Sequence, residues 1–242
     1  MSTPSGYFPA TRHPWPCTLF LLPMLLGYES GVLLLGGQHP ETLRNGADNW
    51  MRFGLTSLGL PFFWLPPLML VAALVGWNFV RRGDRPGDTL GVLTGMSIES
   101  VGFALGLWGV SRALVPLMQQ LGVQLEMGEG GQAAARQVVT YLGAGIYEEA
   151  LFRLALYSGL VWLLRRMEAP KPVAVLLAAT ASATLFSAAH HVGPYGQPYD
   201  NYLFLFRLAA GMYFALLYQY RGFGVAVGAH ACYNLMVSVG VA

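Results

Sequence analysis

The chain has 242 residues, of which 55% are hydrophobic and only 11% are charged, and its mean hydropathy is +0.48. A soluble domain carries roughly 25% charged residues. This chain therefore has too few charges for a water-exposed surface, and its composition favours an integral membrane protein. The formal net charge of +2 is too small to indicate a nucleic-acid partner. Two cysteines in apolar sequence, Cys17 and Cys232, indicate neither a disulfide framework nor a metal site.

Seven apolar segments of near-spanning length follow one another along the chain. They predict an all-α, polytopic transmembrane helical bundle that forms one integral membrane domain over residues 1–242. The first segment, 15–37, lacks a convincing cleavage site and is expected to persist as a helix. A polar loop is expected over 38–52. The other segments are expected at 55–80 (bent or broken at its prolines), 89–118, 134–164, 172–192, 201–220 and 223–241.

Basic residues in three short connections predict the orientation. Seven helices place these connections on one face, which the positive-inside rule assigns to the cytoplasm. The predicted location is a multi-pass position in a membrane, the inner (plasma) membrane of a bacterium. The residues concerned are Arg81, Arg82, Arg85, Arg165, Arg166, Lys171 and Arg221.

The segment 134–164 contains an unusual charged cluster. Each charged residue in a span costs about 2.5–3.5 kcal/mol on insertion scales. Glu149 and Arg153 are four residues apart, so on a helix they share a face and can pair. Glu148 lies about 100° away on the helix and has no evident partner in its own segment. This arrangement marks Glu148 as a candidate functional group.

Further polar groups occur in two later segments. His190 and His191 lie near the end of the fifth segment, and His230 and Asn234 share one face of the seventh. The small residues around them allow close helix approach, so segments four, five and seven are expected to meet around one polar pocket. A carboxylate and an imidazole that share a water can activate it, and a second His with an Asn can stabilise an oxyanion. Hydrolysis of an amide bond within the bilayer fits this set.

Three spacings in the C-terminal half resemble the principal motifs of the CPBP family, the CAAX-processing and bacteriocin-processing proteins also called Abi. The resemblance covers about 136–239, and many family members have eight helices rather than seven. The motifs in this chain are Glu148-Glu149-x-x-x-Arg153, Phe186-x-x-x-His190 and His230-x-x-x-Asn234.

The resemblance implies a glutamic intramembrane endopeptidase of the CAAX type that needs no cofactor. Its substrate would be a peptide or protein associated with the lipid bilayer, lipidated or not. His190 rather than His191 matches the motif. The implied catalytic roles are a general base (Glu148), a water-holding imidazole (His190), an orienting pair (Glu149 and Arg153) and an oxyanion hole (His230 and Asn234).

Two other interpretations stay open. Two His and one Glu would suit zinc, although the chain has no HExxH motif. A non-catalytic immunity, chaperone or transport protein could also hold charged groups in the bilayer. The other charges within apolar segments are expected to be structural: Glu29, Glu99, Arg112 and Arg207.

Overall fold

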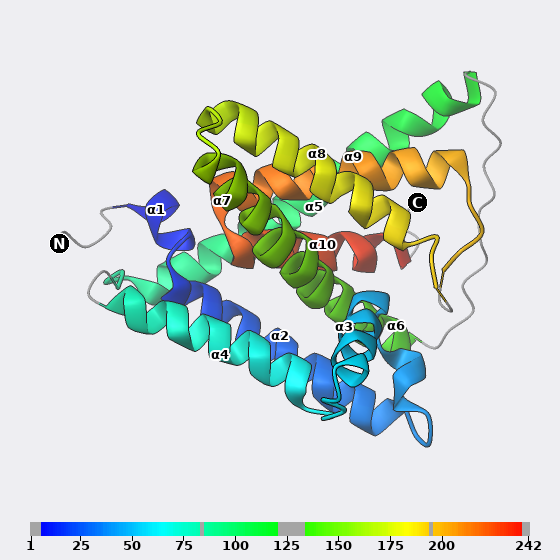
Figure 1. Ribbon diagram of the computed structural model, residues 1–242, viewed down its shortest axis with the longest axis horizontal. Helices are drawn as coiled ribbons and strands as arrows, with labels where there is room; N and C mark the ends of the chain where they lie inside the picture. Colours follow the sequence, from blue (N-terminus) through cyan, green and yellow to red (C-terminus); the bar gives the residue numbers. More distant parts are fainter. Residues whose placement is uncertain (1–5, 83–84, 121–133, 194–195, 239–242) are drawn as a thin grey trace.

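The computed structural model describes residues 6–82, 85–120, 134–193 and 196–238, with the side chains of 114–120 left aside. In these ranges every regular element is a helix, so the all-α class is confirmed (Figure 1). The helices are α1 (Tyr7–Thr11), α2 (Pro14–Leu35), η1 (Pro40–Leu43), α3 (Gly46–Ser57), α4 (Leu65–Val80), α5 (Thr89–Gln120), α6 (Ala134–Gly143), η3 (Ala144–Glu148), η4 (Ala150–Tyr157), α7 (Ser158–Arg166), α8 (Lys171–Ala189), α9 (Asn201–Arg221) and α10 (Phe223–Ser238).

Within the described residues, four helices are long and apolar enough to cross a membrane: α2, the Thr89–Ala113 part of α5, α8 and α9. The apolar helices α4 and α10 are shorter. The expected segment 134–164 is a run of four elements, α6, η3, η4 and α7, without an intervening loop. The chain is therefore an integral membrane protein, while the number of seven crossings stays a prediction. The expected end of the last segment, at 241, lies outside the described residues.

The prediction of a polar loop over 38–52 is wrong, because this stretch holds η1 and most of α3. Asn45 caps α3 by accepting the N–H of Ala47 at 2.8 Å, as short polar side chains do at helix starts. Asp48 in the first turn adds a favourable charge. Asp48 of this helix is buried and Arg52 is half-buried, so the polar side of α3 faces the interior of the protein. The expected break in the second segment is confirmed and spans 58–64, between α3 and α4.

Helix α10 occupies the middle of the bundle. Figure 1 shows it between α2 and α4 on one side and α8 and α9 on the other, and it contacts α5, η3, α9, α2 and α6. Its residues from Phe223 to Ala231 are all buried. A Cβ at Gly145 of η3 would lie 2.9 Å from the Cβ of Ala231. Small residues thus let the element that carries the glutamates touch the helix that carries His230.

Candidate active site

The charged cluster lies where the chain departs from regular α-helix. The segments η3 and η4, which include Glu148 and Arg153, are π-helical, and α-helix resumes at Ser158. Such widened turns occur frequently at functional sites. Sequence spacing alone predicts an ordinary α-helix here, so this feature was not predicted.

Glu149 is held from two sides. Its Oε1 lies 3.2 Å from Nη1 of Arg153 and 2.8 Å from Nδ1 of His230. Both Glu149 and Arg153 are fully buried. The predicted pairing of Glu149 with Arg153 is therefore present, and His230 joins it from α10.

The guanidinium of Arg153 lies between an aromatic ring of α8 and one of α9. Its guanidinium carbon lies 4.5 Å from the ring centre of Phe186 and 5.7 Å from that of Phe214. Nη2 donates to the carbonyl of Gly211 at 3.3 Å. Phe214 also stacks on the His230 ring, with centroids 4.6 Å apart and planes 13° apart. The same aromatic ring thus orients both the arginine and the imidazole.

Glu148 faces two imidazoles and one amide. Its Oε1 accepts the side-chain N–H of Asn45 at 2.8 Å and lies 3.8 Å from Nε2 of His190. Its Oε2 lies 3.6 Å from Nε2 of His230. The two imidazole distances exceed a direct hydrogen bond and suit a bridging water. Glu148, His190 and His230, from segments four, five and seven, therefore lie together in one cluster of polar groups, as expected.

The hydrogen bonds on the far side of each imidazole fix its tautomer. Nδ1 of His190 lies 2.8 Å from the carbonyl oxygen of Phe186, and Nδ1 of His230 faces the Glu149 carboxylate. Both partners are acceptors, so each Nδ1 carries the proton. In the neutral form, each Nε2 presents a lone pair toward Glu148. The carboxylate and the two Nε2 atoms are then all acceptors, and one water molecule can donate to two of them.

The structure does not bring two of the polar residues into this cluster. Asn234 is half-buried one turn beyond His230, and it makes no side-chain hydrogen bond to a described residue. His191 turns away: its Nδ1 lies 3.2 Å from the carbonyl oxygen of Pro198, and its ring packs against Tyr199 and Phe204.

The other charges within apolar segments contact neighbouring groups. Glu99 pairs with Arg221 at 2.7 Å, across α5 and α9. Arg112 lies over the ring of Trp108. Arg207 donates to the side chain of Gln197, whose backbone N–H in turn donates to the carbonyl of His190. Arg207 is therefore linked to the loop that carries His190.

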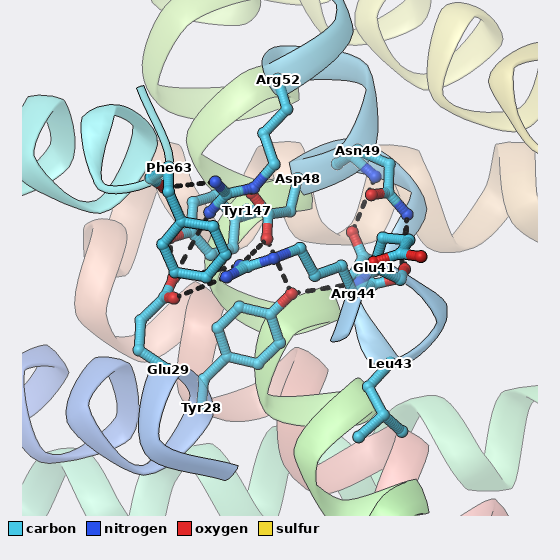
Figure 2. A network of polar contacts seen from close by, with 12 residues as sticks. Tyr28, Glu29, Glu41, Leu43, Arg44, Asp48, Asn49, Arg52, Phe63 and Tyr147 are labelled. Atoms are coloured by element: carbon cyan, nitrogen blue, oxygen red, sulfur yellow. Dashed lines mark hydrogen bonds and ion pairs between the residues drawn. The ribbon is translucent and has the colours of Figure 1, made fainter. Parts of the chain in front are cut away.

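Glu29 belongs to a network of buried charges, which Figure 2 shows together with Tyr28 and Tyr147. Arg44 bridges Glu29 at 3.1 Å and Asp48 at 2.6 Å, and Arg52 lies 2.8 Å from Asp48. Burial lowers the pKa of Arg44, but the adjacent carboxylates of Asp48 and Glu29 raise it above its ordinary value. The spacings 44–48 and 48–52 are helical i,i+4 pairs, and this signal could have revealed α3 in the sequence.

No group of three or more His, Cys, Asp or Glu among the described residues is arranged to hold a metal ion.

A known protein family matches most of the second half of the chain. Residues 131–236 match the family model described as type II CAAX prenyl endopeptidase Rce1-like, which confirms the resemblance carried by the three motifs. Neither curated proteins nor solved structures gave a significant match. The matched segment contains every residue of the three motifs: Glu148, Glu149, Arg153, Phe186, His190, His230 and Asn234.

Proposed function

Because residues 131–236 match the family model described as type II CAAX prenyl endopeptidase Rce1-like, we propose that this membrane protein is a glutamic intramembrane endopeptidase. One observation carries the proposal: the buried carboxylate of Glu148 faces Nε2 of His190 at 3.8 Å and Nε2 of His230 at 3.6 Å. A carboxylate and the acceptor nitrogen of His190 can hold and polarise one water molecule, and Nε2 of His230 then remains to stabilise the oxyanion.

In the proposed reaction, a water bound between Glu148 and His190 attacks the peptide carbonyl carbon and gives its proton to Glu148. The carbonyl oxygen becomes an oxyanion, which needs donors. His230 can donate from Nε2 when it is protonated, and Glu149 at its Nδ1 stabilises that imidazolium. Asn234 supplies a second donor, after a rotation toward the pocket. Glu148 then passes its proton to the leaving amine as the C–N bond breaks.

The proposed substrate is a peptide or protein associated with the bilayer. The family description names a CAAX prenyl endopeptidase, and a lipid-modified chain end would deliver the scissile bond to a buried site. In a bacterial inner membrane, the proposed location, an unmodified membrane peptide can be delivered in the same way. We propose that no metal takes part, because Glu148 can act as a general base directly.

The test compares protein N-termini in membranes of cells that produce the wild type, Glu148→Gln or Glu168→Gln. Glu168 is exposed between α7 and α8 and serves as the matched control. We expect defined new N-termini with the wild type and the control, and none with Glu148→Gln at equal protein levels. Identical profiles for all three proteins would favour a non-catalytic immunity, chaperone or transport role. Loss of cleavage with 1,10-phenanthroline and recovery with zinc would favour a metal-dependent protease.

A further inference from the structure

Asn45 links the N-terminal half of the chain to the proposed catalytic carboxylate. Its Oδ1 accepts the N–H of Ala47, and its Nδ2 donates to Oε1 of Glu148, each at 2.8 Å. A backbone N–H can only donate, so the amide oxygen must face Ala47 and the NH2 group must face Glu148. The helix cap therefore fixes which end of the amide points into the site.

The position of Asn45 is itself fixed by buried groups. Its backbone N–H donates to the hydroxyl of Tyr28 at 3.1 Å, and that hydroxyl donates to Asp48 at 2.9 Å. Arg44, the preceding residue, is 5% exposed and pairs with both Asp48 and Glu29. The network thus holds the start of α3 against α2.

The same network also holds the chain next to Glu148. Tyr147 is fully buried, and its hydroxyl donates to Oε1 of Glu29 at 2.7 Å. Figure 2 shows Tyr28, Glu29, Arg44 and Tyr147 gathered around the same group of carboxylates. Arg44, which precedes Asn45, pairs with Glu29, and Glu29 accepts a hydrogen bond from Tyr147, which precedes Glu148. One cluster therefore fixes both ends of the Asn45–Glu148 hydrogen bond.

A helix cap alone does not require asparagine. Asp and Ser cap about as well as Asn, and Asp200 caps α9 through a carboxylate oxygen. An ionised Asp can only accept, and Ser must donate and accept through one oxygen on a shorter side chain. An amide offers an acceptor to the helix and, on a separate atom, a donor to a second group. At this position the second group is Glu148.

We propose that Asn45 is a positioning residue for Glu148, supplied by a part of the chain outside the family-matched segment 131–236. Its N–H occupies Oε1 and fixes the carboxylate plane. With the carboxylate held in this way, its two oxygens face Nε2 of His190 at 3.8 Å and Nε2 of His230 at 3.6 Å, which is the side on which the proposed water is bound. This inference rests on the proposed function, because it assigns a role in the same reaction.

The experiment separates the donor from the cap. Asn45→Ser and Asn45→Asp keep an oxygen that can cap α3 and remove the NH2 group. Asn49→Ser, four residues on, removes an amide that donates to the carbonyls of Glu41 and Arg44, away from the site. Each purified full-length variant is reconstituted in lipid nanodiscs with the substrate protein whose N-terminus depends on Glu148.

We expect kcat to fall about ten- to a hundredfold in both Asn45 variants, the loss typical of a misplaced catalytic group. In Asn45→Ser, KM and thermal stability should stay close to those of the wild type, whereas Asn45→Asp also places a second carboxylate beside Glu148 and should lose stability. Asn49→Ser should retain the wild-type kcat. Unchanged kcat in Asn45→Ser and Asn45→Asp would overturn the inference, since Asn45 would then be only a cap. Cleavage by Glu148→Gln at the wild-type rate would instead overturn the proposed function.

A second readout tests the contact without any substrate. Infrared spectra of protein labelled with ¹³C-carboxyl glutamate are compared between the wild type and Asn45→Ser. Loss of the amide donor should shift one carboxylate band, and the same comparison in a Glu148→Gln background should show no such shift. If the shift is absent, or persists without Glu148, the proposed contact is wrong.

Discussion

The pair formed by Glu149 and Arg153 allows a quantitative test of how the site is held. Both side chains are completely buried, and their closest atoms are 3.2 Å apart. Oε2 of Glu149 and Nε of Arg153 have no hydrogen-bond partner among the described residues. The pair therefore depends on mutual charge attraction more than on a full set of hydrogen bonds, and removal of one partner leaves a buried charge.

The structure predicts that the two single substitutions differ in cost. Glu149→Gln leaves Arg153 with the carbonyl of Gly211 at 3.3 Å and two aromatic rings, so we expect a loss of about 3–5 kcal/mol in unfolding free energy. Arg153→Met leaves Glu149 with Nδ1 of His230 at 2.8 Å. Because His230 can become an imidazolium, this variant should lose less.

The double variant Glu149→Gln/Arg153→Met removes both charges and should lose less than the sum of the single losses, by at least about 2 kcal/mol. It should still fail to cleave, because Nδ1 of His230 no longer faces the carboxylate of Glu149. Unfolding is followed by pulse proteolysis during a detergent titration. Glu41→Gln, which breaks the exposed contact between His39 and Glu41, is the control and should leave stability unchanged. Additive losses, or a larger loss in Arg153→Met than in Glu149→Gln, would refute the reasoning.

Two further comparisons test the packing and the choice of histidine. A Cβ at Gly145 would lie 2.9 Å from the Cβ of Ala231, so Gly145→Ala should cost about 1–3 kcal/mol of stability and reduce cleavage. A Cβ at Gly159 meets nothing within 4 Å, so Gly159→Ala should be neutral or stabilising by up to about 1 kcal/mol. Equal behaviour of the two glycine variants in unfolding and cleavage assays would contradict the close contact of η3 with α10. His190→Ala should abolish the Glu148-dependent N-termini and His191→Ala should retain them, because His190 faces Glu148 and His191 faces the carbonyl of Pro198. The opposite result would assign the water-holding role to His191.

The motif spacing predicted much of this arrangement and failed at identifiable points. The i,i+4 rule predicted that Glu149 and Arg153 pair, and small residues predicted that the helix of His230 approaches them. Neither rule can say that His230 bonds Glu149 as well as facing Glu148, because that depends on the rotation of α10 about its axis. The π-helical widening over η3 and η4 also leaves no mark in hydrophobic periodicity.

The contribution of Asn45 was missed for a different reason. Its stretch contains Arg44, Asp48 and Arg52 within nine residues, and such a density of charge predicts exposure to water. In the structure these charges neutralise one another and Glu29 in a buried network. A prediction from polarity alone therefore made 38–52 an exposed loop, although the i,i+4 spacing of its charges was visible in the sequence.

The two adjacent glutamates differ because they face different parts of the bundle. Glu149 points toward Arg153 of η4 and His230 of α10, and both of these residues contact its Oε1. Glu148 points toward α3, where a neutral amide takes one oxygen and the other faces an imidazole nitrogen at 3.6 Å. Glu149 thus bonds a guanidinium and one imidazole nitrogen, whereas Glu148 bonds a neutral amide and faces Nε2 of both imidazoles. Glu148 is therefore the carboxylate that can share a water with those nitrogens. His230 contacts both, so the charge on Glu149 reaches the pocket through its ring, while the proton transfer is left to Glu148.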